Sequence, residues 1–130
     1  MTILQPPGWP QPKGYANGIA VTGRMIFTAG VIGWNEREVL VSHRLDQQFA
    51  QALRNIIAII AEGGARPEHI VRLTIYITDA QEYLVSRDEL APLWKSIMGN
   101  HYPAIAMVEV VRLVEKSAKV EIEATAVIPE

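Results

Sequence analysis

Hydrophobic residues recur every three or four positions between residues 46 and 62, which is the spacing of one face of an α-helix. They are Phe49, Leu53, Ile56, Ile57 and Ile60. Gly63-Gly64 follows directly, and glycine readily adopts the left-handed conformation that ends many helices. The pattern predicts a helix from Asp46 to Glu62.

Hydrophobic and polar residues then alternate over residues 71–78, which predicts a half-buried strand. A second helix is expected over residues 80–98, with Asp79 as its N-cap. Pro92 lies inside this helix, and proline lacks the amide that a helix interior needs. We therefore expect two helical pieces, or a kink near Ala91.

The ends of the chain predict further strands. Two runs rich in hydrophobic residues, Gly18–Thr22 and Met25–Val31, flank Gly23-Arg24 and predict a hairpin. A weaker strand is expected at residues 39–41. The last two strands are expected at residues 102–110 and 119–127, joined by a short polar link.

The first thirteen residues contain Pro6, Pro7, Pro10 and Pro12. Proline fixes φ and has no amide donor, so residues 1–13 are expected to form an extended arm. The remaining residues, 14–130, are expected to form a single domain, because 130 residues are too few for two independent cores.

The predicted order of elements is β-β-(β)-α-β-α-β-β, which indicates an α+β fold with a mixed sheet and two helices on one face. No remaining helix can cover the other face. Because 49% of the residues are hydrophobic, we expect that face to be buried against other subunits.

The amino-acid composition argues against several classes of function. A net charge of −2 without a basic cluster argues against nucleic acid as a partner. The chain contains no cysteine, so thiolate chemistry is excluded. No leader-like segment opens the sequence, and no hydrophobic run is long enough to cross a membrane. A cytoplasmic location is therefore expected.

The motifs of phosphate-binding loops, dinucleotide-binding loops, zinc proteases and serine hydrolases are absent. His43, His69 and His101 have no ligand spacing, and neither a metal nor a cofactor is expected. The carboxylates Glu109 and Glu121, set in hydrophobic strands, remain as candidates. The alternation of hydrophobic and polar residues along these strands does not decide the role of either carboxylate. Each could simply face solvent, or it could hold or transfer a proton near neutral pH.

A series of motifs extends over residues 13–128. It comprises Gly14-Tyr15, Phe27-Thr28-Ala29-Gly30, a helix with Gln51, Ala52, Leu53 and Asn55 ending in Gly63-Gly64, Pro103-Ala104, Val108-Glu109-Val110, and Val120-Glu121-Ile122-Glu123-Ala124. In order and spacing the series resembles the Rid/YjgF family of reactive-intermediate (enamine/imine) deaminases, also described as L-PSP endoribonucleases.

This resemblance implies a chorismate-mutase-like protomer, a homotrimer with a central barrel of three sheets, and ligand clefts between neighbouring subunits. It implies hydrolysis of imines or enamines to keto compounds and ammonia, with no metal or organic cofactor. Glu121 would activate water. The substrate-binding residues would be Tyr15, Ala29, Gly30, Trp34, Ile105 and Met107.

The chain departs from the family pattern at Ile105, where the active branch has an arginine that grips the substrate carboxylate. Isoleucine offers no donor for such a contact. Ala29 and Val31 replace a serine and a glutamine of the family. Trp34 adds a large aromatic side chain near the expected cleft, either as a ligand contact or as core filler. The candidates for a replacement cation are Arg24, Arg72, Arg87 and Arg112.

Two functions follow from these observations. The first is a Rid-type imine or enamine deaminase whose substrate differs from simple 2-imino acids and resembles an aminomuconate. The alternative is a non-catalytic trimeric module that binds a small metabolite or a partner in the same clefts. A ribonuclease is the weakest interpretation, because the sequence has neither a histidine pair nor a basic groove.

Overall fold

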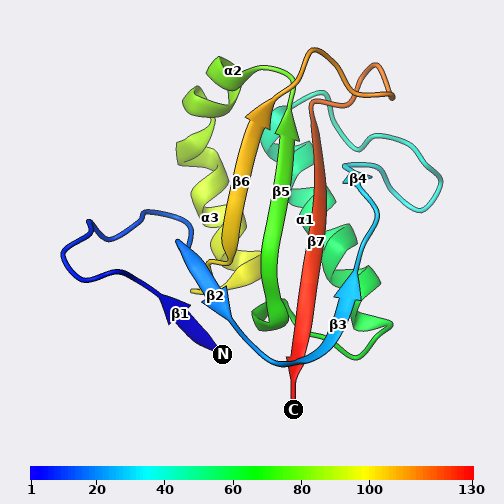
Figure 1. Cartoon of the computed structure of the whole chain (residues 1–130). Coiled ribbons are helices and arrows are strands. Elements are labelled where there is room, and N and C mark those ends of the chain that lie inside the picture. The colour runs from blue at the N-terminus through cyan, green and yellow to red at the C-terminus, as the bar shows by residue number, and fades with distance from the viewer.

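The computed structural model describes all 130 residues and contains a mixed sheet with helices on one face (Figure 1). Its strands are β3 (Gly23–Phe27), β4 (Val31–Ile32), β5 (Ile70–Ile77), β6 (Ala104–Glu109) and β7 (Val120–Pro129). They are ordered β3-β7-β5-β6, and β4 also pairs with β7. Only β5 and β6 are parallel. The α+β class and the mixed sheet are therefore confirmed.

The helices are α1 (Leu45–Ala61), α2 (Ala80–Val85) and α3 (Arg87–Met98), with a short 3-10 turn, η1 (Pro67–His69), before β5. The first predicted helix is confirmed, and Gly64 after it has a φ of +86°. The predicted N-cap is also confirmed, because the Asp79 side chain accepts hydrogen bonds from the amides of Gln81 and Glu82.

The second helix is divided in two as expected, but the predicted position of the break was wrong. The break lies at Ser86, whose hydroxyl donates to the Glu82 carbonyl at 2.8 Å, and not near Ala91. Pro92 lies within α3. The helix tolerates the proline because α3 packs against α1, and tertiary packing outweighs one missing backbone hydrogen bond.

The predicted hairpin was wrong. β2 (Gly18–Ala20) pairs with β1 (Thr2–Leu4) in a separate two-stranded sheet, while β3 pairs with β7 (Figure 1). The arm offers β2 an alternative strand partner, and Leu4 packs over Gly18, where an added Cβ would already lie 3.4 Å from Leu4 Cδ1. The weaker strand at residues 39–41 is reduced to one bridge between Leu40 and Trp34.

The main core lies between α1, α3 and the sheet. It contains 17 buried residues, among them the fully buried Leu53, Ile56, Leu73 and Ile122. The opposite face of the sheet has no helix over it (Figure 1). There Met25 and Phe27 are 56% and 67% exposed. None of the helices combines the length and the hydropathy needed to span a bilayer.

Candidate functional site

A cavity of about 580 Å³ opens between the N-terminal arm, α3 and β6. We call it the α3–β6 cavity. Ten of its thirteen lining residues are hydrophobic or aromatic. The lining consists of Lys13, Gly14, Tyr15, Phe49, Ile75, Tyr83, Arg87, Leu90, Ala91, Trp94, Tyr102, Ile105 and Met107.

Three of the predicted binding residues, Tyr15, Ile105 and Met107, meet in this cavity. Alternation along β6 directs Ile105 and Met107 toward the helices. The arm brings Tyr15 close to them, because the next residue, Ala16, donates its amide to the Pro103 carbonyl at 3.0 Å. Residues far apart in the sequence therefore form one wall.

Aromatic side chains form much of the remaining wall. Trp94 and Tyr102 are stacked, with ring centroids 5.8 Å apart and an interplanar angle of 7°. The indole Nε1 of Trp94 donates to the His101 carbonyl at 3.3 Å. His101 in turn contacts the Ile70 carbonyl through Nε2 at 2.6 Å. These contacts join the aromatic wall to the start of β5.

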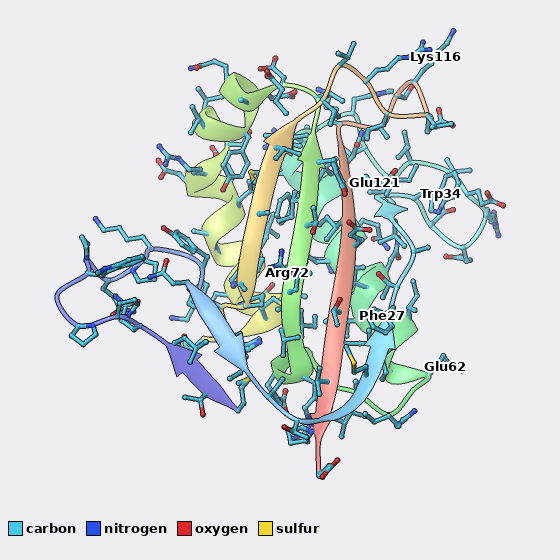
Figure 2. The ribbon with its side chains drawn as sticks, viewed as in Figure 1. Phe27, Trp34, Glu62, Arg72, Lys116 and Glu121 are labelled. Carbon is cyan, nitrogen blue, oxygen red and sulfur yellow. The ribbon has the colours of Figure 1, made fainter.

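The only charged residues in the lining are Lys13 and Arg87, and no carboxylate is among them. Of the four arginines that the sequence offered as replacement cations, only Arg87 reaches this cavity. Arg24 donates to the Gly63 carbonyl at the end of α1. Arg72 lies on the uncovered face of the sheet in a small pocket with Glu123 (Figure 2), and Arg112 is exposed after β6.

Glu121 lies on the other face of the sheet, near the start of β7 (Figure 2). Its neighbour Ile122 is fully buried against the helices, and side chains alternate along a strand. The half-buried Glu121 carboxylate has no hydrogen-bond or ion-pair partner within the chain. This carboxylate is therefore free to engage a water molecule or a ligand.

Gly30 lies directly beside this carboxylate. A Cβ built on Gly30 would overlap the Glu121 carboxylate and lie 2.9 Å from its Cδ. Thr28 positions this segment, because its hydroxyl donates to the Ala29 carbonyl at 2.8 Å and accepts from the Ala124 amide at 3.0 Å. Ala29 and Gly30 are both exposed.

The other two carboxylates of these strands have partners. Tyr76 donates its hydroxyl proton to Glu123 Oε1 at 2.8 Å. This hydrogen bond raises the pKa of Tyr76 above its ordinary value of 10.0. Glu109 accepts the Ala80 amide at 2.8 Å and so helps to start α2. Of the three carboxylates in β6 and β7, only Glu121 is left without a partner.

Trp34, the remaining predicted binding residue with a large side chain, is not among the residues that line the α3–β6 cavity. It is half-buried against the cluster of Ile32, Leu113 and Ala118 and lies in the loop after β4 (Figure 2). Asn55 on α1 holds this loop through hydrogen bonds to the Ile32 and Trp34 carbonyls at 3.0 and 2.9 Å. This packing corresponds to the core-filling interpretation of Trp34.

The predicted site residues therefore form two sets on opposite faces of the sheet. Tyr15, Ile105 and Met107 line the cavity on the helical face, whereas Gly30 and Glu121 lie on the uncovered face. β5 separates β6 from β7. One chain alone does not bring the two sets together.

Most of the cavity wall was not predicted from the sequence. Tyr83 and Trp94 lie within the predicted second helix and Tyr102 at the start of a predicted strand, but no role in a site was expected for them or for Lys13. Three of the four tyrosines line the cavity. Their aromatic rings, which combine hydrophobic surface with a polar hydroxyl group, were the one available signal.

Comparison with known proteins gives a consistent result. The family model described as Endoribonuclease L-PSP matches residues 10–128. A RutC family protein of Aquifex aeolicus is 33% identical over 98% of this chain and 99% of its own length. The 2-iminobutanoate/2-iminopropanoate deaminase of Salmonella typhimurium is 30% identical over 87% of this chain and 86% of its own.

A solved structure also resembles this fold closely. The protein YyfB of Yersinia pestis, described as a member of the conserved Rid protein family and of unknown function, superimposes with a TM-score of 0.82. The match covers 98% of both chains at 26% identity.

Proposed function

Because the chain belongs to the Endoribonuclease L-PSP family, which includes the Rid and YjgF proteins, we propose that it is a Rid-type deaminase that hydrolyses a C=N bond and releases ammonia. The relative from Salmonella typhimurium is named as such a deaminase. The observation that carries the proposal is the free, half-buried Glu121 carboxylate against the Gly30 backbone.

In the proposed reaction, a water molecule adds to the carbon of the C=N bond while Glu121 accepts a proton from that water. Glu121 returns this proton to the nitrogen of the resulting carbinolamine, and the proton of the carbinolamine hydroxyl group also passes to the nitrogen as the C–N bond breaks and ammonia leaves. The oxygen atom stays on carbon as a carbonyl group. One water is consumed for each ammonia released, and an enamine enters the same sequence after it tautomerises to the imine.

We propose further that the complete site forms between neighbouring copies in a homotrimer. The α3–β6 cavity and Glu121 face away from each other in one chain, so the cavity of one copy must meet the Glu121 of the next. The uncovered face supports this arrangement, since it exposes Met25 and Phe27. Exposed hydrophobic groups of this kind are typical of surfaces that other subunits cover.

The substrate is proposed to differ from a simple 2-imino acid. Ile105 lines the cavity where the family's active branch places an arginine, and isoleucine cannot bind a carboxylate. A substrate whose carboxylate lies further from the C=N bond, as in an aminomuconate, fits this change. The same observation favours the second candidate function, a module that binds a small metabolite without turnover.

A panel of imines that carry their carboxylate beside the C=N bond, further from it, or not at all tests this proposal. Ammonia release above the spontaneous rate is expected for the imines whose carboxylate lies further from the C=N bond, and loss of that release is expected in the Glu121→Ala variant. Equal rates for the wild-type protein and the variant would contradict the deaminase. Saturable binding with no turnover of any imine would favour the binding module.

A further inference from the structure

The α3–β6 cavity is large for the substrates named in its relatives. Its volume of about 580 Å³ falls within the range of about 300–1,000 Å³ that is typical of pockets for drug-sized ligands. The reacting part of a 2-iminopropanoate has only a handful of heavy atoms. A ligand that fills this cavity therefore carries an additional group.

The wall indicates what that group is. The stacked Trp94 and Tyr102 present aromatic surface, and Phe49, Leu90 and Met107 add hydrophobic surface. Such a lining favours a flat or branched hydrophobic group by burial of its surface and by ring contacts.

The charge of the wall indicates a second requirement. Lys13 and Arg87 are its only charged residues, and neither forms an ion pair within the chain. The exposed Arg87 makes one hydrogen bond within the chain, from Nε to the Leu84 carbonyl at 3.3 Å. Its two terminal nitrogens have no partner in the protein.

The position of Arg87 differs from that of the missing family arginine. Arg87 is the first residue of α3, whereas Ile105 is on β6, and both contribute to the lining of one cavity. A guanidinium group binds a carboxylate through two parallel hydrogen bonds wherever it is placed. An anion held by Arg87 is therefore anchored on the helical wall instead of the strand wall.

We infer that Arg87 is the anion-binding residue of the α3–β6 cavity, and that the cavity selects carboxylates attached to an aromatic or bulky hydrophobic group. As a statement about substrates, this inference rests on the proposed deaminase. As a statement about binding, it can be tested without any turnover. Lys13, on the N-terminal arm, adds a second positive charge to the lining.

The test uses the full-length protein and two stable probes of nearly equal size, 4-phenylbutanoate and the neutral 4-phenylbutanamide. Titration calorimetry measures both affinities, and Trp94 fluorescence supplies an independent signal. The wild-type protein is expected to bind the carboxylate at least about tenfold more tightly than the amide, the effect of a hydrogen bond to a charged group. Arg87→Gln is expected to abolish this preference by weakening carboxylate binding about tenfold.

Two variants serve as controls. Arg112→Gln removes the same charge from an exposed position outside the cavity and should keep the preference intact. Arg87→Lys keeps the positive charge but loses the two parallel hydrogen bonds of a guanidinium group. It should retain part of the preference for the carboxylate. Equal binding of both probes to the wild-type protein, or a preference that survives Arg87→Gln, would overturn the inference. A preference that depends on Lys13 and not on Arg87 would also overturn it.

The outcome is separable from that of the proposed function. If no imine is hydrolysed but the carboxylate preference depends on Arg87, the deaminase proposal fails and this inference holds. If imines are hydrolysed and Arg87→Gln changes neither binding nor the preference for carboxylate substrates, the inference alone fails.

Discussion

The two faces of the sheet divide the chemistry of this protein between them. The helical face carries the α3–β6 cavity, which is aromatic and positively charged and contains no carboxylate. The uncovered face carries Glu121, a carboxylate with no partner, beside a glycine that leaves room for it. The first face is suited to hold an anionic hydrophobic ligand, and the second to accept a proton. Residues that belong to one site by family pattern thus point in opposite directions in a single chain.

The largest effect is expected from the uncovered face. Glu121→Gln should lower the rate of imine hydrolysis by about 10²–10⁴-fold, the usual contribution of a general base. Glu123→Gln is the matched control, because it makes the same change two residues away on the same face, where Tyr76 already engages the carboxylate. Initial rates of ammonia release measure both. A Glu123 variant as inactive as the Glu121 variant would show that charge on this face, and not Glu121 itself, is what matters.

Two glycines that flank β4 provide the next comparison. Gly30→Ala should displace the Glu121 carboxylate and lower activity by about a hundredfold, as small misplacements of catalytic groups do. The melting temperature should change little, because the overlap is with the end of a flexible side chain.

Gly33→Ala should instead lower the stability of the fold and change the activity of the folded protein little. A Cβ there would lie 2.6 Å from Gln48 Cα on α1, and backbone cannot yield as a side chain does. A loss of about 1–3 kcal/mol in the free energy of unfolding is expected. Denaturant unfolding of both variants checks the contrast. If Gly30→Ala is destabilised but its folded fraction has normal activity, the space at Gly30 does not position the Glu121 carboxylate for the reaction.

A smaller effect is expected on the helical face. Ile105→Arg should raise kcat/KM for simple 2-imino acids by about tenfold, since it adds a charged hydrogen-bond donor to the β6 wall. It should also cost about 1–3 kcal/mol of stability, because Ile105 packs against the core. Val111→Arg is the control, since Val111 lies outside the cavity and is fully exposed. If both variants change the rates equally, residue 105 does not determine specificity.

The smallest effect concerns pH. The hydrogen bond to Glu123 raises the pKa of Tyr76 above 10.0, so the folded protein binds this proton more tightly than the unfolded chain. Its stabilisation is complete below pH 10.0 and is lost as the pH rises through the higher folded pKa. The melting temperature should fall less steeply above pH 10 in Tyr76→Phe than in the wild-type protein. If the melting temperatures of the two proteins fall in parallel above pH 10, the hydrogen bond between Tyr76 and Glu123 contributes nothing to the pH dependence of stability.

The sequence could predict those features that depend on neighbouring residues. Alternation along β7 separates the fully buried Val120 and Ile122 from Glu121, and helical spacing gives α1 within a residue. The hairpin prediction failed because a two-residue break does not choose a strand's partner, and β1 competes for β2.

The site was less predictable, because its members come from distant segments. The family resemblance directed attention to Ile105 and Glu121, but no pattern shows that they lie on opposite faces of the sheet until β5 is placed between β6 and β7. Likewise, nothing in the sequence distinguishes Arg87 from the other three candidate arginines. Only the packing of α3 beside β6 brings Arg87 to the cavity.

The central claim is that the cavity of one copy works with the Glu121 of another. Ala91→Trp should fill the cavity from an exposed position on α3 without disturbing the core, and Glu121→Gln removes the carboxylate. Each variant alone should be inactive.

The most direct measurement is the rate of imine hydrolysis after equal amounts of the two variants are unfolded together and refolded. Random assembly in a closed ring should restore about a quarter of the wild-type activity, because that share of the interfaces joins an intact cavity to an intact Glu121. Mixed oligomers that remain as inactive as either variant alone would contradict the account, since a site within one chain cannot be restored by mixing.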